Sequence, residues 1–136
     1  MLKIAVLDDY AGVARAMADW SSLRAEVTVF EVPLGADIAA TLAPFDVLCV
    51  MRERTPLPGA LIAALPNLKL IVTTGPRNLS IDLGAAKARG ITVCGTRSRK
   101  TTTSELTLTL MLALSRRLLP EARAFAAGGW QGGPGR

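Results

Sequence analysis

Histidine is absent from all 136 residues of the chain. Because imidazole is the commonest protein ligand of zinc and the usual base beside a nucleophilic serine or cysteine, its absence excludes His-ligated metal sites and Ser-His-Asp or Cys-His catalysis within these residues. Cysteine is scarce as well, and Cys49 and Cys94 each lie inside an apolar, strand-like run. We therefore expect two buried free thiols rather than a disulfide or a metal site.

Aromatic side chains and long hydrophobic runs are also scarce. Aromatics make up only 4% of the residues while half of all residues are apolar, so Ala, Val, Ile and Leu must form the core, as they do in helix-covered parallel sheets. The apolar run at 106–114 is far shorter than the about 20 residues that a membrane span needs, and Arg116 follows it. No signal-peptide pattern precedes the first apolar run. These features predict a cytoplasmic protein that does not contact membranes.

The positive charge of the chain is dispersed. The formal charge is +5, yet lysines and arginines are spread along the sequence, with the densest run at Arg97-Ser98-Arg99-Lys100. A nucleic-acid-binding protein gathers such charge on one face or helix. We interpret the run as a solvated loop and expect no nucleic-acid partner.

Five apolar runs rich in β-branched residues alternate with segments of helical periodicity. The runs cover residues 3–7, 27–32, 46–51, 69–74 and 91–94, and the helical segments cover 11–20, 37–42, 58–65, 80–90 and 102–127. Asp37 and Ser80 are the predicted N-caps, and Gly90 is the predicted stop of the fourth helix. This alternation predicts an α/β fold of three layers, with a parallel five-stranded sheet in flavodoxin-like order.

The last helical segment is apolar on most of its sides. Leu106 and Leu110 share one face, and Leu108 adds apolar surface elsewhere around the axis. One short domain would struggle to cover such a helix, and Pro120 is expected to kink it. We therefore divide the chain into a domain at residues 1–100, a long C-terminal crossing helix at 101–127 and a glycine-rich linker at 128–136.

Two loops at predicted strand ends are candidates for holding an anion. Thr74 and Gly75 form a strand-to-turn corner whose backbone N–H groups can approach an anion closely; the alternative is a simple tight turn that Asn78 stabilises. Arg52 can pair with a carboxylate or a phosphate; the alternative is an exposed loop whose charge Glu53 neutralises.

A third candidate is the start of the last helix, at residues 101–105. It combines several hydroxyl groups, including that of Thr103, with the free N–H groups of a helix N-terminus, which favour an anion. The alternative is a capping box formed by Thr102 and Glu105.

The acidic pair Asp8 and Asp9 follows the first predicted strand. Receiver domains of phosphorelays place a magnesium-binding pair there, but they also need an aspartate after the third strand and a lysine after the fifth. Those positions here read Val50-Met51-Arg52 and Val93-Cys94-Gly95-Thr96. We expect the pair to cap the following helix or to stay solvated, and keep a receiver-like domain as a less favoured alternative.

Several spaced elements of the chain together carry a family resemblance. They are Thr74-Gly75 followed by Asn78 and Ile81-Asp82, then Ala-Ala-x-x-x-Gly-Ile-x-Val at 85–93, and a helix with Ser104-Glu105 near its start. In this order they resemble the D-isomer-specific 2-hydroxyacid dehydrogenases, the group that contains phosphoglycerate dehydrogenase-like enzymes. The resemblance covers residues 3–130, which correspond to the first, substrate-binding part of such enzymes.

The resemblance implies a role for each candidate loop. The amides of Thr74 and Gly75 would hold the substrate carboxylate, Arg52 would line the substrate side of an interdomain cleft, and Thr74 and Thr103 would contact the nicotinamide cofactor, NAD or NADP. The catalytic Arg, Glu and His of the family would lie beyond residue 136, so no catalytic residue and no metal ligand is predicted here. The helix at 102–119 would join two subunits in a homodimer.

The sequence is therefore interpreted as the N-terminal part of an NAD(P)-dependent D-2-hydroxyacid dehydrogenase acting on a small 2-hydroxy or 2-keto acid. Because the 136 residues contain neither a dinucleotide fingerprint nor a histidine general acid, we expect this chain alone to be inactive. The other alternative is a stand-alone binding or regulatory module without catalysis.

Overall fold

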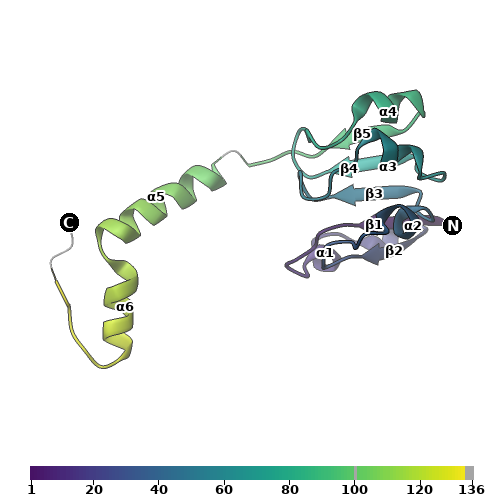
Figure 1. Ribbon diagram of the computed structural model, residues 1–136. Coiled ribbons are helices and arrows are strands. Elements are labelled where there is room, and N and C mark those ends of the chain that lie inside the picture. Colours follow the sequence, from purple (N-terminus) through teal and green to yellow (C-terminus); the bar gives the residue numbers. More distant parts are fainter. Residues whose placement is uncertain (100, 134–136) are drawn as a thin grey trace. The chain divides into compact units, whose positions relative to one another are not determined.

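The structure is a computed structural model that describes residues 1–99 and 101–133 (Figure 1). It divides into two compact units, Met1–Ser98 and Arg99–Arg136, which are described separately below. In the first unit the elements follow in the order β1 (Leu2–Val6), α1 (Ala14–Met17), a 3-10 turn (Trp20–Ser22), β2 (Ala25–Val29), α2 (Ile38–Leu42), β3 (Val47–Val50), α3 (Gly59–Ala63), β4 (Leu70–Thr73), α4 (Leu83–Ala88) and β5 (Thr92–Gly95).

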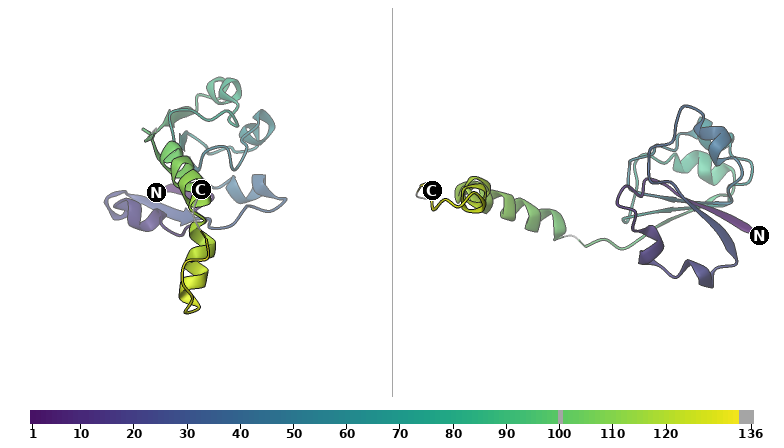
Figure 2. Two further views of the ribbon diagram at one scale, coloured as in Figure 1. Left: turned by 90° about the vertical axis from the view of Figure 1, so that its left-hand side faces the viewer. Right: turned by 90° about the horizontal axis from the view of Figure 1, so that it is seen from below.

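The five strands form one parallel sheet in the order β2-β1-β3-β4-β5. This order confirms the predicted flavodoxin-like α/β fold. Figure 2 shows α1 on the opposite face of the sheet from α2 and α4, so helices lie on both faces. The strand bounds differ from the predicted ones by at most three residues.

The core lies between the sheet and the helices α2, α3 and α4. Its fully buried side chains are aliphatic, as the scarcity of aromatics predicts, and the largest are Leu7, Leu42, Leu48, Val50, Leu57, Ile62, Leu65 and Ile71. Burial of each stabilises the fold by roughly 1.5–3 kcal/mol. Phe30 and Phe45 meet edge to face at its rim, with ring centroids 6.0 Å apart.

Two helix starts test the predicted caps. The Asp37 carboxylate accepts the Ala40 N–H, which confirms Asp37 as the N-cap of α2. The N-cap of α4 is Asp82, whose carboxylate accepts the Ala85 N–H at 2.9 Å, so the prediction of Ser80 is wrong. The carbonyl of Ser80 instead accepts the Leu57 N–H, because a short parallel bridge holds this segment extended and delays the helix.

The first helix is shorter than predicted. Only Ala14–Met17 is helical, after Gly12 at φ 64° and before the 3-10 turn at Trp20–Ser22. The Asp19 carboxylate captures the Ser21 N–H, which starts that turn and ends the regular helix. Trp20 is half-buried and donates to the Ala14 carbonyl, whereas Met17 is exposed.

Cys49 and Cys94 are both free, but they differ in burial. Cys49 lies in the central strand β3 and is partly buried, and desolvation raises the pKa of its thiol. Cys94 is exposed, so the prediction of a buried thiol is wrong for it. The reason is that Cys94 lies in β5, an edge strand with neighbours on one side only.

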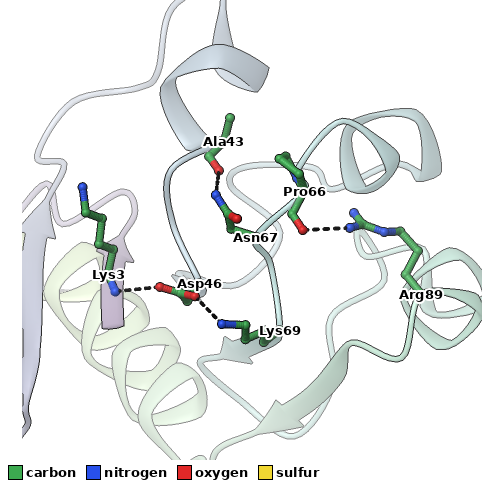
Figure 3. A network of polar contacts seen from close by, with 7 residues as sticks. All are labelled: Lys3, Ala43, Asp46, Pro66, Asn67, Lys69 and Arg89. Carbon is green, nitrogen blue, oxygen red and sulfur yellow. Dashed lines mark hydrogen bonds and ion pairs between the residues drawn. The ribbon is translucent and has the colours of Figure 1, made fainter. Parts of the chain in front are cut away.

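At the amino-terminal ends of the strands, Asp46 connects β1 to Lys69, the residue before β4 (Figure 3). Its carboxylate accepts the Lys3 backbone N–H at 2.9 Å and the Lys69 ammonium at 2.7 Å. The hydrogen bond from Lys69, followed by that from Lys3, lowers the pKa of Asp46. Figure 3 also shows Asn67 donating to the Ala43 carbonyl.

The second unit contains two helices where one was predicted. Helix α5 (Thr102–Ser115) ends before Arg117, which has a left-handed backbone at φ 53°, and α6 (Leu118–Ala126) follows. The prediction of one helix to residue 127 is therefore wrong. Pro120 does not kink it, because the proline lies in the first turn of α6, where no N–H is needed.

Neither α5 nor α6 has a buried residue. The exposed large apolar side chains are Leu106, Leu108, Leu110, Met111, Leu112, Leu114, Leu118, Leu119 and Phe125. Among the described residues, no helix is both long enough and apolar enough to cross a membrane.

The start of the predicted linker folds back on α6. The Gly129 N–H donates to the Ala124 carbonyl, and the Gly132 N–H donates to the Glu121 carboxylate at 2.7 Å. Trp130 is exposed. Residues 134–136 of the predicted linker lie outside the described residues.

Candidate functional site

The candidate site of the first unit is the edge of the sheet where the strands end. Arg52 lies after β3, Thr74 and Gly75 follow β4, and Thr96 follows β5. Ligands of open parallel sheets bind just beyond the carboxyl ends of the strands. The structure therefore places the predicted residues Arg52, Thr74 and Gly75 at one edge, where Arg52 is hydrogen-bonded to Thr74, and Gly75 to Thr96.

Arg52 has an unusual backbone and an unengaged side chain. Its φ of 51° lies in the left-handed region, which residues other than glycine rarely adopt. Its N–H donates to the Thr74 hydroxyl at 3.0 Å, and its carbonyl accepts from the Asn78 amide. The guanidinium is exposed, and within the described part of the chain neither Glu53 nor any other carboxylate pairs with it.

The amides of Thr74 and Gly75 are already engaged within the chain. The Thr74 N–H donates to the Val50 carbonyl at 3.0 Å and so continues the sheet. The Gly75 N–H donates to the Thr96 hydroxyl at 2.9 Å. Because the Thr96 side chain can change its χ1 rotamer while the Val50 carbonyl is fixed in the strand, the Gly75 N–H is the one that an incoming anion can take over.

The turn at Gly75 also depends on a close backbone approach. Gly75 has φ 96°, a conformation that glycine adopts at little cost. A Cβ atom at Gly95 would lie 2.6 Å from the Gly75 carbonyl oxygen. Glycine is therefore needed at position 95 if the β4 turn and the end of β5 are to meet.

Asn78 connects the loop after β3 to the turn after β4. Its side chain is only 6% exposed. The amide nitrogen donates to the Arg52 carbonyl and, at 3.1 Å, to the Thr73 hydroxyl, and its oxygen accepts the Ser80 N–H at 2.8 Å. The sequence indicated the stabilisation of the turn, but the link to Arg52 spans 26 positions and no local pattern signals it.

A second cluster joins the loop after β1 to the loop after β3. The buried Asp8 carboxylate accepts the Thr55 hydroxyl at 2.7 Å and the Tyr10 hydroxyl at 2.9 Å, while Arg54 stacks on the Tyr10 ring and donates to the Asp8 carbonyl. The hydrogen bond to Asp8, then desolvation and the Asp8 charge, raises the pKa of Tyr10. Arg54 therefore has an internal partner, unlike Arg52.

The acidic pair serves the local structure. Asp8 is hydrogen-bonded as described, and the Asp9 carboxylate accepts the N–H groups of Val13 and Ala14 at the start of α1. As expected, Asp9 thus binds the first N–H groups of α1, although the N-cap residue itself is Val13. Both aspartates are buried, so neither is solvated.

A cavity of about 300 Å³ opens beside the end of β4. The turn after β4 forms one wall and β5 the other. Its lining includes Arg77, Asn78, Leu79 and Val93.

Thr103 lies in the second unit, in the first turn of α5. Its carbonyl accepts the Thr107 hydroxyl at 2.8 Å. The predicted capping box does not form, because the N-cap is Thr101 rather than Thr102 and no side chain caps it. The Thr101 carbonyl instead accepts the Glu105 N–H, the first regular bond of the helix.

Comparison with known proteins identifies the family. The family model described as D-isomer specific 2-hydroxyacid dehydrogenase, catalytic domain, matches residues 4–128. The chain belongs to this family. This confirms the resemblance and favours the dehydrogenase interpretation over a receiver-like domain or a stand-alone binding or regulatory module without catalysis.

Individual members of the family agree with this assignment. A glycerate dehydrogenase from Methylorubrum extorquens is 31% identical over 121 residues, which cover 82% of this chain and 38% of that protein. The crystal structure of a phosphoglycerate oxidoreductase from Vibrio cholerae superimposes with a TM-score of 0.84 and 38% identity over 100% of this chain and 45% of that one.

A third relative gives the same result. A putative D-3-phosphoglycerate dehydrogenase from Ralstonia solanacearum superimposes with a TM-score of 0.81 and 34% identity over 96% of this chain and 40% of that one. The chain thus spans less than half the length of each of these three relatives.

Proposed function

We propose that this chain is the substrate-binding part of an NAD- or NADP-dependent D-2-hydroxyacid dehydrogenase, which transfers a hydride between a 2-hydroxy acid and its 2-keto acid. The observation that carries the proposal is Arg52, at the strand ends of a chain of this family: its backbone N–H is bonded to the Thr74 hydroxyl, and its guanidinium pairs with no carboxylate among the described residues. The chain binds and orients the acid, and no catalytic residue is assigned within it.

The substrate is a small acid with at least one anionic group. An arginine pairs with a carboxylate or a phosphate through two parallel hydrogen bonds, and Arg52 is held at the site by its backbone. The Gly75 N–H supplies a second contact once the Thr96 side chain rotates about χ1 and its oxygen leaves the N–H.

The cofactor is proposed to be NAD or NADP, which supplies or accepts the hydride. Members of the family bind NAD, among them a 3-phosphoglycerate dehydrogenase and a D-lactate dehydrogenase solved with it. In this chain we assign contacts to Thr74 and Thr103. The Thr74 hydroxyl fits such a contact, because it donates only to the Met51 sulfur at 3.3 Å, a weak acceptor that a cofactor oxygen can replace.

The proposed domain organisation assigns residues 1–100 to substrate binding, 101–127 to the segment that crosses to a cofactor domain, and 128–136 to a linker. Residues 102–119 are proposed to form a homodimer contact, which the exposed leucines of α5 support. A cytoplasmic location is part of the same proposal.

Titration calorimetry of the 136-residue chain with 3-phosphoglycerate and D-glycerate tests the proposed function. We expect binding by the unmodified chain and at least about tenfold weaker binding by Arg52→Gln, because a charge-assisted hydrogen bond is lost. The matched control is Arg24→Gln, which replaces an exposed arginine just before β2 and should bind like the unmodified chain. Equal affinity of Arg52→Gln and the unmodified chain would contradict the assignment of Arg52.

A further inference from the structure

The left-handed backbone of Arg52 requires an explanation. Among the described residues only Asp8, Arg52 and Arg117 adopt positive φ without being glycine. In this region the Cβ atom crowds the neighbouring carbonyl, so the conformation persists only where surrounding contacts impose it. Strained backbones of this kind gather at ligand-binding sites.

Two hydrogen bonds impose the conformation, one on each side of the residue. The N–H of Arg52 donates to the Thr74 hydroxyl, and the carbonyl of Arg52 accepts from the Asn78 amide. Both partners follow β4, whereas Arg52 follows β3. The loop after β3 is thus fixed by the neighbouring strand rather than by its own sequence.

Asn78 is itself held in a single orientation. Its side chain is buried, and its nitrogen also donates to the hydroxyl of Thr73, the last residue of β4. Its oxygen accepts the Ser80 N–H. With donors and acceptor all engaged, Asn78 cannot turn without breaking three hydrogen bonds at once.

We propose that Asn78 is a positioning residue that holds the Arg52 backbone in its left-handed conformation and thereby presents the guanidinium to the anionic group of the substrate. This inference rests on the proposed function, because it takes Arg52 as the substrate contact. It goes further in assigning a role to a residue that has no need to touch the substrate. Rigid presentation strengthens binding because less freedom is lost when the acid arrives.

A purely structural role of Asn78 in the turn predicts a different outcome. In that case its essential bond is the one to Ser80, and an aspartate at position 78 would preserve it. An aspartate side chain has no amide N–H with which to hold the Arg52 carbonyl. Asn78→Asp therefore keeps the hydrogen bond that stabilises the turn and removes the one that positions Arg52.

The test measures the Arg52 backbone and the binding of 3-phosphoglycerate in the same protein. Carbon chemical shifts of Arg52 in the labelled 136-residue chain report its left-handed conformation, and calorimetry gives the dissociation constant. In Asn78→Ala we expect Arg52 to leave the left-handed region and the dissociation constant to rise by about tenfold or more. The added charge of Asn78→Asp also affects anion binding, so for this variant only the Arg52 chemical shifts test the proposal. We expect them to show that Arg52 leaves the left-handed region.

The matched control is Asn67→Ala, which removes the only other asparagine of the chain and its bond to the Ala43 carbonyl. It should change neither the Arg52 shifts nor the affinity. If Asn78→Ala proves unfolded, the Arg52 shifts of Asn78→Asp carry the test.

Each failure has its own signature. Arg52 remaining left-handed in Asn78→Asp, or unchanged affinity in folded Asn78→Ala, overturns the positioning role while the proposed function stands. An unmodified chain that binds 3-phosphoglycerate without involving Arg52 overturns the substrate assignment and with it this inference.

Discussion

Replacing Leu108 and Leu112 of α5 by glutamate is expected to abolish self-association of the chain. The two side chains are 60% and 64% exposed, and complete burial of a leucine is worth about 1.5–3 kcal/mol. Covering the exposed three-fifths therefore yields about 1–2 kcal/mol for each leucine. In a two-fold symmetric dimer each protomer buries both leucines, so four leucines contribute about 4–8 kcal/mol to the free energy of association. This corresponds to about a thousandfold or more in affinity.

Sedimentation velocity over a range of protein concentrations measures this effect. We expect the unmodified chain to form dimers or larger species at micromolar concentrations, and Leu108→Glu/Leu112→Glu to sediment as a monomer with an unchanged circular dichroism spectrum. The matched control is Leu23→Glu/Val32→Glu, which replaces exposed apolar residues of the first unit and should associate like the unmodified chain. A monomeric unmodified chain at high micromolar concentration would refute the reasoning.

Three further predictions concern the first unit, each measured by urea unfolding. Leu48→Ala should lower the free energy of unfolding by about 2–5 kcal/mol, because Leu48 is fully buried, and a loss below 1 kcal/mol would contradict the described core. Gly95→Ala should destabilise by about 1–3 kcal/mol and shift the Gly75 amide resonance, since the new Cβ meets the Gly75 carbonyl; an unchanged resonance would show that the turn is not so close. The lowered pKa of Asp46 means that its bonds stabilise the chain above the unfolded-state pKa of about 3.9 and cease to do so as the pH falls through the folded-state pKa. Asp46→Asn should therefore show a shallower loss of stability below about pH 4 than the unmodified chain, and identical acid profiles would contradict this.

The sheet could be predicted because its signals are local. Each buried strand is an uninterrupted apolar run, and the alternation with helices leaves few permitted strand orders. Local chemistry also identified Asp37 as a cap and Gly90, at φ 68°, as a helix stop.

The errors arise where a distant contact outweighs the local pattern. Ser80 is a good capping residue, but its pairing with the segment around Leu57 keeps it extended, and Asp82 caps the helix instead. Cys94 lies in an apolar run, yet edge position leaves it exposed. The periodicity from 102 to 127 continues through Arg117, although the left-handed backbone there separates α5 from α6.

The location of the candidate site could be predicted from the sequence, but the hydrogen bonds that hold its residues in place could not. Strand ends, an arginine and a glycine turn, together with the family resemblance, indicated Arg52, Thr74 and Gly75 as candidates from the sequence. The bonds of Asn78 to Arg52 and of Gly75 to Thr96 join positions 26 and 21 residues apart, and only the folded sheet brings these residues together.

The central claim is that the edge formed by Arg52 and Gly75 binds the anionic group of a 2-hydroxy acid. The most direct measurement is a map of amide chemical-shift changes as 3-phosphoglycerate is added to the 136-residue chain. The account predicts that the largest saturable changes lie at Arg52, Gly75 and Thr96, as the Gly75 N–H exchanges the Thr96 hydroxyl for the ligand. Saturable changes elsewhere, with the Gly75 amide unmoved, would contradict it.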